Sequence, residues 1–153
     1  MTGAAFSLRL SSPAPSPDSE AARYARGREV LEQVAGPTGV AITEGLASTA
    51  PALVHHVVAY GFGDVYPQPE LDPARRQLVT IGALTALGGC DRQLEVHVQA
   101  ALNVGLSPAE IVAAVTHAAL YSGFPRALNA MTVVQGVLAA RDPSPGAPPA
   151  SPS

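Results

Sequence analysis

Lysine is absent from this 153-residue chain, and all nine of its basic residues are arginine. The protein therefore has neither a Schiff-base lysine nor the lysine of a Walker-type phosphate loop. Its single cysteine, Cys90, excludes an intrachain disulfide and any zinc site built on several cysteines. The net charge of -3, with no block of basic residues, argues against nucleic acid as a partner.

Charged residues are also scarce, at 14% of the sequence against the usual share of about 25%. A surface so poor in charge indicates that part of it is buried against other subunits. No apolar run approaches the ~18 residues of a membrane-spanning helix. The first residues lack the basic start and long apolar run of a secretory signal. We expect a soluble, cytoplasmic protein that binds no membrane.

Two segments rich in proline and serine frame a single domain. Residues 1–17 and 142–153 cannot bury enough apolar surface to offset their chain entropy, so we expect both to be disordered tails. The domain between them spans residues 18–141.

This domain is predicted to be an all-α bundle of six or seven helices, because no segment alternates with the period of a half-exposed strand. The segment 61–70, with two glycines and two prolines, is predicted to be a loop. The stretch 78–87 is apolar on all sides, so we expect it to be buried on all sides. Predicted helices cover residues 18–35, 40–47, 50–60, 72–87, 91–104, 107–121 and 126–140.

Histidines on two predicted helices are candidates for chemistry. His97 shares a helix face with Leu94 and Ala101, so we expect its side chain to point inward. An inward histidine is most often a hydrogen-bonded core residue, and otherwise an acid, a base or an oxyanion partner. His117, which is in line with Tyr121, has the same two interpretations. No ligand spacing accompanies any histidine, so we expect no metal site.

Arginine and cysteine supply further candidates. Of Arg75 and Arg76, we expect one to face solvent or an acidic neighbour and the other to be partly buried. A buried arginine needs an anionic partner, either a protein carboxylate such as Asp64 or that of a substrate. Cys90 precedes a predicted helix, whose N-terminus favours a thiolate, although a small half-buried residue is the commoner case.

Three motifs in this region resemble those of the carboxymuconolactone decarboxylase family. The first, LD-x-x-x-R, begins at residue 71. The second, H-x-x-x-A-L-N-x-G-x-S-x-x-E-I, begins at His97, and the third, Y-x-G-x-P-x-A, begins at Tyr121. They occur in the family's order and at its spacing, and the resemblance extends over residues 24–140.

The resemblance implies an AhpD-like helical fold, interlocked into a homo-oligomer that is a trimer or hexamer. One branch of this superfamily is an alkylhydroperoxidase that uses a C-x-x-C pair four residues before its histidine. Here the pair is Cys90 and Gln93, so the two-thiol cycle is broken. The other branch decarboxylates 4-carboxymuconolactone without metal or organic cofactor. The resemblance favours this branch for the present sequence.

The resemblance to the decarboxylase branch implies roles for individual residues. Arg76 would bind the substrate anion, and His97 would donate a hydrogen bond or the proton. Asp64 would orient His97 or relay the proton, while Phe62 and Tyr66 would shape the pocket. His117 and Tyr121 are further candidates for substrate binding.

The family loop W-G-E-(V/I)-W differs here at three positions, as residues 62–66 read FGDVY. The changes indicate a reshaped pocket for an unsaturated lactone or carboxylic acid, or for a related biosynthetic intermediate. Three alternatives stay open. They are a tailoring enzyme for cyclisation, isomerisation or dehydration, a one-cysteine thiol peroxidase, and a non-catalytic helical partner protein.

Overall fold

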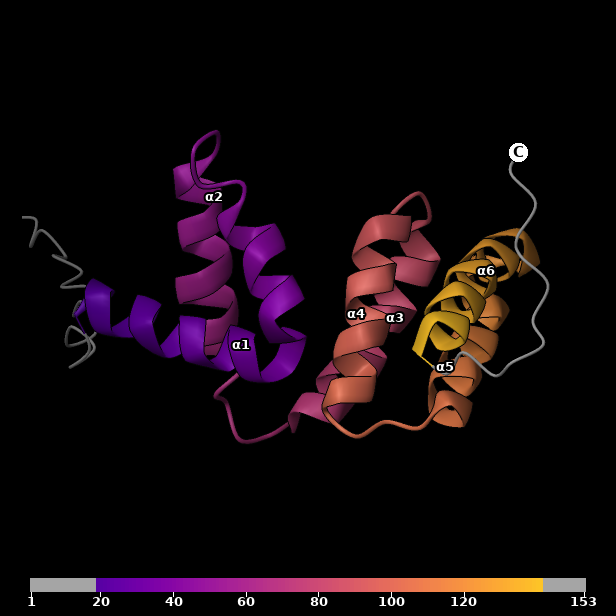
Figure 1. Cartoon of the computed structure of the whole chain (residues 1–153). Helices are drawn as coiled ribbons and strands as arrows, with labels where there is room; N and C mark the ends of the chain where they lie inside the picture. Colours follow the sequence, from indigo (N-terminus) through magenta and orange to yellow (C-terminus); the bar gives the residue numbers. More distant parts are fainter. Residues whose placement is uncertain (1–18, 142–153) are drawn as a thin grey trace, which may run out of the picture.

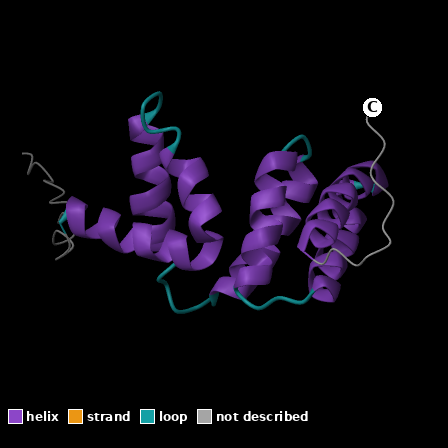
Figure 2. Ribbon diagram, in the orientation of Figure 1, coloured by secondary structure: helices purple, strands orange, loops and turns teal. Residues whose placement is uncertain are grey.

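The computed structural model describes residues 19–141, and this part of the chain contains helices and no strand (Figures 1 and 2). The all-α class is therefore confirmed, whereas both predicted tails lie outside the described residues. None of the described helices combines the length and hydropathy needed to cross a membrane. The elements are α1 (Glu20–Glu44), α2 (Pro51–His55), the π-helix η1 (His56–Val65), α3 (Pro73–Leu87), α4 (Asp91–Asn103), α5 (Pro108–Ser122) and α6 (Phe124–Arg141).

Side-chain caps fix the starts of α3 and α5 where the sequence predicted them. The carboxylate of Asp72 accepts a hydrogen bond from the backbone N–H of Arg75 at 2.8 Å. Ser107 and Glu110 form a reciprocal capping box at the start of α5. Each cap satisfies N–H groups that have no partner within their own helix. In both helices a proline occupies the first turn, where it costs no hydrogen bond.

One kinked element replaces the two helices predicted over 18–35 and 40–47. α1 breaks at Gly36, whose φ of 67° lies in the left-handed region that favours glycine. Pro37 then restarts the helix at once, since its fixed φ suits a first helical turn. The predicted helix end at residue 35 therefore lies directly before the break at Gly36, whereas the gap predicted between residues 35 and 40 is helical from Pro37 onward.

The predicted loop over 61–70 is wrong for its first half, because η1 continues to Val65. Gly63 in this segment permits close helix packing. A Cβ on Gly63 would overlap the carbonyl oxygen of Arg23 on α1, and a Cβ on Gly27 would overlap that of Val58 on η1. Tyr66 therefore follows directly on a packed helix. The true loop is the segment 66–72, where Pro67 and Pro69 prevent further helix.

Two hydrophobic clusters meet at α4. The larger cluster lies among α3, α4, α5 and α6, with Ile81, Val98 and Val115 fully buried. The smaller one joins α1, α2 and η1 to Ala100 of α4. Because α4 contributes to both, its side chains at the junction lie between the two halves of the chain.

The expectation that residues 78–87 are buried on all sides is wrong for the described chain. Val79 is 63% exposed and Leu87 is 67% exposed, while the buried stripe of α3 is Gln77, Ile81 and Thr85. An apolar face therefore remains uncovered on α3. Large exposed apolar residues also occur on α5 and α6, namely Leu120, Tyr121, Phe124 and Leu128.

Replacing Gly27 by alanine should lower the free energy of unfolding by about 1–3 kcal/mol, since the added methyl has no space against η1. Urea denaturation followed by circular dichroism measures this change. Gly136→Ala on α6 is the matched control. A Cβ there has no neighbour within 4 Å, so it should raise stability by about 0.5–1 kcal/mol. Equal effects of the two substitutions would contradict the packing role of Gly27.

Candidate functional site

His97 is half-buried on α4 and makes one specific polar contact. Its Nδ1 lies 2.9 Å from the side-chain oxygen Oε1 of Gln77. An amide oxygen can only accept a hydrogen bond, so this contact is a hydrogen bond when Nδ1 carries a proton. Burial lowers the pKa of His97 below its ordinary value near 6.5. The surroundings of the ring thus favour the neutral imidazole over the imidazolium.

Gln77 of α3 is 0% exposed and bonds at both ends of its amide. Besides the contact to His97, its Nε2 donates to the hydroxyl of Tyr66 at 2.9 Å. A continuous hydrogen-bond chain thus joins Tyr66, Gln77 and His97, which come from three different segments. The sequence analysis missed Gln77. Its place four residues before Ile81, on the stripe that becomes buried, was the available signal.

Tyr66 is held between an aromatic ring and a cation. Its ring stacks on Phe62 at a centroid distance of 4.6 Å, and the guanidinium carbon of Arg76 lies 5.8 Å from its centroid. Burial raises the pKa of Tyr66, although Arg76 and the bond from Gln77 act in the opposite direction. The hydroxyl therefore keeps its proton at neutral pH and can donate it in a hydrogen bond.

The two neighbouring arginines divide as the sequence predicted. Arg75 is exposed and pairs with Asp72. Arg76 is half-buried and donates to two backbone carbonyls of the preceding loop, from Nε to Leu71 at 2.9 Å and from Nη2 to Gln68 at 2.8 Å. Among residues 19–141, no carboxylate lies within ion-pairing distance of Arg76. Its charge is therefore available to an anion from outside the chain.

Asp64 lies elsewhere than expected. Both of its carboxylate oxygens accept hydrogen bonds from Arg23 of α1, and Nη2 of Arg26 lies 3.6 Å from Oδ1. The bond from Arg23 lowers the pKa of this carboxyl group. The position next to His97 that was expected for Asp64 is occupied by Gln77 in the described structure. Asp64 instead ties η1 to α1.

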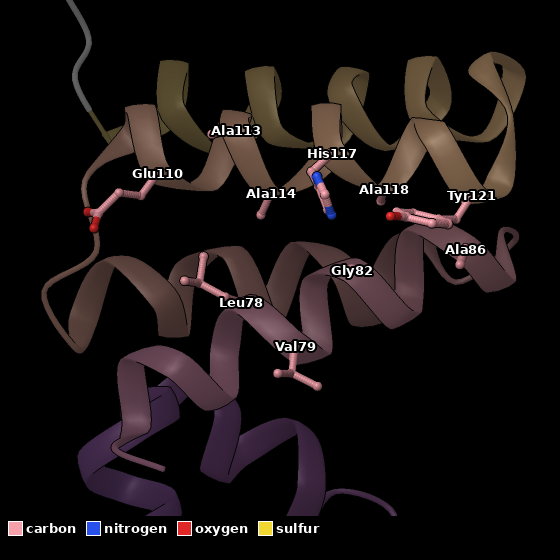
Figure 3. Close-up of a pocket in the computed structure, with 10 residues that line it drawn as sticks. All are labelled: Leu78, Val79, Gly82, Ala86, Glu110, Ala113, Ala114, His117, Ala118 and Tyr121. Atoms are coloured by element: carbon pink, nitrogen blue, oxygen red, sulfur yellow. The ribbon is translucent and has the colours of Figure 1, made fainter.

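His117 and Tyr121 belong to a separate groove. They line a cavity of about 600 Å³ between α3 and α5, and their ring centroids lie 5.4 Å apart. In Figure 3 the side chain of His117 points from α5 toward α3 and the ring of Tyr121 lies along the space between the two helices, where Gly82 and Ala86 also line the groove. His97 is not among the residues that line this groove. A substrate-binding role for His117 and Tyr121 stays a prediction.

The remaining candidates have local surroundings. Cys90 is half-buried at the position before α4 and has no cysteine partner in the chain. Nε2 of His55 lies 3.0 Å from the carboxylate oxygen Oε1 of Glu20, and its ring stacks on Tyr24. These contacts are typical of a histidine with a structural role. Within the described residues, no group of three or more His, Cys, Asp or Glu side chains is placed to hold a metal ion.

Taken together, the fold is a helical bundle with a small polar chain at the junction of two apolar clusters. Residues 51–136, which run from α2 into α6, match the carboxymuconolactone decarboxylase family. A 4-carboxymuconolactone decarboxylase of Acinetobacter baylyi is 33% identical over 116 residues, covering 75% of this chain and 86% of that protein. The chain therefore belongs to the carboxymuconolactone decarboxylase family, as its motifs predicted.

Other relatives are similar over shorter stretches. A nitrosuccinic acid decarboxylase of Metarhizium robertsii is 35% identical over 79 residues, which are 52% of this chain and 54% of that protein. An uncharacterized 15.0 kDa protein of Paracoccus denitrificans is 32% identical over 100 residues, covering 65% and 72% of the two chains. Two of the three relatives are thus named as decarboxylases of small acids.

The lowered pKa of His97 should make stability depend on pH. The unfolded chain binds this proton more readily, so the contribution of the neutral ring is complete above pH 6.5 and is lost as the pH falls below it. One pKa unit corresponds to about 1.4 kcal/mol. The melting temperature of the wild type should therefore fall between pH 7 and pH 5 more steeply than that of His97→Asn, which places an amide near Nδ1. His117→Asn, at an exposed histidine, should keep the wild-type slope.

Proposed function

We propose that this protein is a cofactor-independent carboxy-lyase that acts on a small acid with an electron-withdrawing group placed to accept the electron pair left by CO2. One observation carries the proposal. Arg76, with no carboxylate partner in the described chain, lies against Tyr66, whose hydroxyl is linked through Gln77 to His97. An anion-binding cation, a neutral hydroxyl donor and an imidazole are the groups that such a reaction requires.

The chemistry defines what the site must do. Loss of CO2 from a carboxylate leaves an electron pair on carbon, and a proton must then replace the lost group. In an unsaturated lactone the pair spreads to the carbonyl oxygen as an extended enolate, and in a nitro acid it spreads to the nitro oxygens. The relatives named for 4-carboxymuconolactone and nitrosuccinic acid both act on acids with such a sink. Shared sink chemistry, more than a shared carbon skeleton, therefore defines the proposed substrate class.

Each residue then has a role in this reaction. Arg76 holds the substrate anion, and Tyr66 stacked on Phe62 excludes water and offers its hydroxyl to the developing oxyanion. His97 delivers the proton that replaces CO2. Asp64 acts at a distance, because its bond to Arg23 holds η1, and with it both rings, against α1.

The aromatic segment 62–66 supports a substrate other than the family's usual one. Phe62, Asp64 and Tyr66 differ from the W-G-E-(V/I)-W pattern, and Phe62 stacks on Tyr66, whose hydroxyl is bonded to Gln77. A biosynthetic intermediate that undergoes cyclisation, isomerisation or dehydration is the second candidate. Such a reaction would use the same oxyanion donor and the same proton carrier. A peroxidase reaction at Cys90 would lie outside this hydrogen-bond chain.

We also propose that the protein is a homo-oligomer, a trimer or a hexamer. The exposed apolar residues on α3, α5 and α6 support this, because a single chain leaves them in water. Tyr121, for example, is 81% exposed, and Leu87 is 67% exposed. Obligate interfaces are apolar in this way, like a core divided between subunits. The low share of charged residues is consistent with such burial.

The proposed activity is tested by incubating the purified protein with 4-carboxymuconolactone and, separately, with nitrosuccinic acid, while CO2 release is followed. His97→Asn should lower kcat/KM by about 10²–10⁴-fold through loss of the proton donor. Arg76→Gln should lower it by about 10–100-fold, mainly through KM, because a charge-assisted hydrogen bond to the substrate is lost.

Arg75→Gln is the matched control for Arg76, since it removes the neighbouring exposed charge and should leave kcat/KM within about twofold. Release of CO2 from neither acid by the wild type would reject both as substrates. Full activity in His97→Asn would remove His97 from the mechanism.

The oligomer is tested by light scattering coupled to size-exclusion chromatography. We expect a mass of three or six chains for the wild type and smaller species for Leu128→Glu, which places a charge on the apolar face. Gln33→Glu, which places a charge at an exposed position on α1 and away from this face, should leave the mass unchanged. A monomeric wild type would contradict the proposed assembly.

A further inference from the structure

We propose that Gln77 is a positioning residue that keeps the proton of neutral His97 on Nδ1, so that Nε2 is the atom that exchanges a proton with the substrate. The catalytic consequence rests on the carboxy-lyase function proposed above. The tautomer itself is a property of the protein without substrate and is tested independently.

The geometry of Gln77 carries this inference. Its side chain is fully buried, so water does not compete for either end of the amide. The oxygen Oε1 faces Nδ1 of His97 at 2.9 Å, and Nε2 faces the hydroxyl of Tyr66 at the same distance. An oxygen that can only accept demands a donor, which places the imidazole proton on Nδ1.

The same amide also sets the direction of donation at the Tyr66 end of the hydrogen-bond chain. Because the oxygen of Tyr66 accepts from Gln77, the hydroxyl proton is left for a second acceptor. The hydrogen-bond chain thus ends in a hydroxyl donor at Tyr66 and in a lone pair at Nε2 of His97. Turning the amide over would reverse both ends together. A single buried side chain therefore decides which group stabilises an oxyanion and which carries a proton.

This polarity fits the proton balance of decarboxylation. Nε2 takes up one proton from water, and the hydroxide that is left combines with the released CO2 as bicarbonate. The ring becomes an imidazolium that still donates from Nδ1 to Gln77. The substrate carboxylate then leaves as neutral CO2, and its bonding pair moves into the electron sink. The proton on Nε2 passes to the carbon that lost CO2, and the neutral ring returns. Because the Nδ1 proton stays in place, Gln77 needs no rearrangement between turnovers.

A neutral amide suits this task better than a carboxylate. A glutamate at position 77 would also accept from Nδ1, but its negative charge would stabilise the imidazolium and raise the pKa of His97. The ring would then hold its proton more tightly. Gln77 fixes the tautomer and leaves the proton on Nε2 easy to transfer.

The test is nitrogen-15 NMR of the histidine rings in the full-length protein without substrate, with His97 assigned by its loss in His97→Asn. The wild type should show a protonated Nδ1 and an unprotonated Nε2 at pH 7. Gln77→Glu should keep this tautomer and raise the titration midpoint of His97 by about 1–3 units. Gln77→Met should shift the ring toward the Nε2–H form, which free histidine favours in water. Tyr66→Phe should do so in part, because the amide loses the group that fixes its orientation.

Gln135→Glu and Gln135→Met are matched controls at an exposed glutamine and should leave the spectrum of His97 unchanged. A wild-type ring protonated on Nε2 would overturn the proposal. So would an unchanged tautomer and midpoint in Gln77→Glu and Tyr66→Phe, two nearly isosteric variants that report even if Gln77→Met does not fold.

Activity gives a second readout that a merely structural role would not move. If Nε2 donates only when protonated, kcat/KM should fall as the pH rises through the pKa of His97. In Gln77→Glu this fall should occur at a higher pH, displaced by the same amount as the titration midpoint of His97 in NMR. The two proposals fail separately. The expected tautomer without CO2 release would reject the carboxy-lyase function alone, whereas CO2 release with the other tautomer would reject the role of Gln77 alone.

Discussion

A buried amide is the constraint on which the site depends. Gln77 has no access to water, and an unsatisfied buried polar group costs about 1–3 kcal/mol. Tyr66 and His97 must therefore both be in place for the amide to be satisfied. Since Tyr66 follows η1, Gln77 lies on α3 and His97 on α4, one side chain links the two apolar clusters. The contacts that arrange the candidate site thus also dock the two halves of the chain.

Close backbone packing joins α1 to η1. Gly27 and Gly63 let α1 and η1 approach until carbonyl oxygens fill the space where Cβ atoms would be. The ion pair of Asp64 with Arg23 closes the same contact from the side. The aromatic residues at the end of η1 are consequently held by a helix pair, and Tyr66 is oriented before any substrate binds. A π-helix in this place is in keeping with the frequent occurrence of such turns at functional sites.

The sequence predicted what depends on local chemistry. The predicted helix starts at residues 72 and 107 and the predicted helix end at residue 35 agree with the cap at Asp72, the capping box at Ser107 and the break at Gly36, each of which is decided within a few residues. The extension of η1 was missed because glycine signals both a turn and a close approach, and only the tertiary partner distinguishes them. Gln77 was missed for a related reason, since a polar residue gains meaning only from the two groups that it connects. The resemblance to the family supplied His97 and Arg76, whereas the partner of Asp64 required the fold.

The electrostatics of the site explain why Arg76 has backbone partners in place of a carboxylate. A protein carboxylate beside it would neutralise the guanidinium and compete with the substrate anion. Two carbonyl bonds orient the cation and leave its charge in place. In the proposed decarboxylation the negative charge leaves the carboxylate and appears on the electron sink, so the anion stays and only its location changes. A fixed cation beside a neutral tyrosine hydroxyl can stabilise that charge at either location, while a neutral His97 would add no competing charge before it takes up the proton that we propose it delivers.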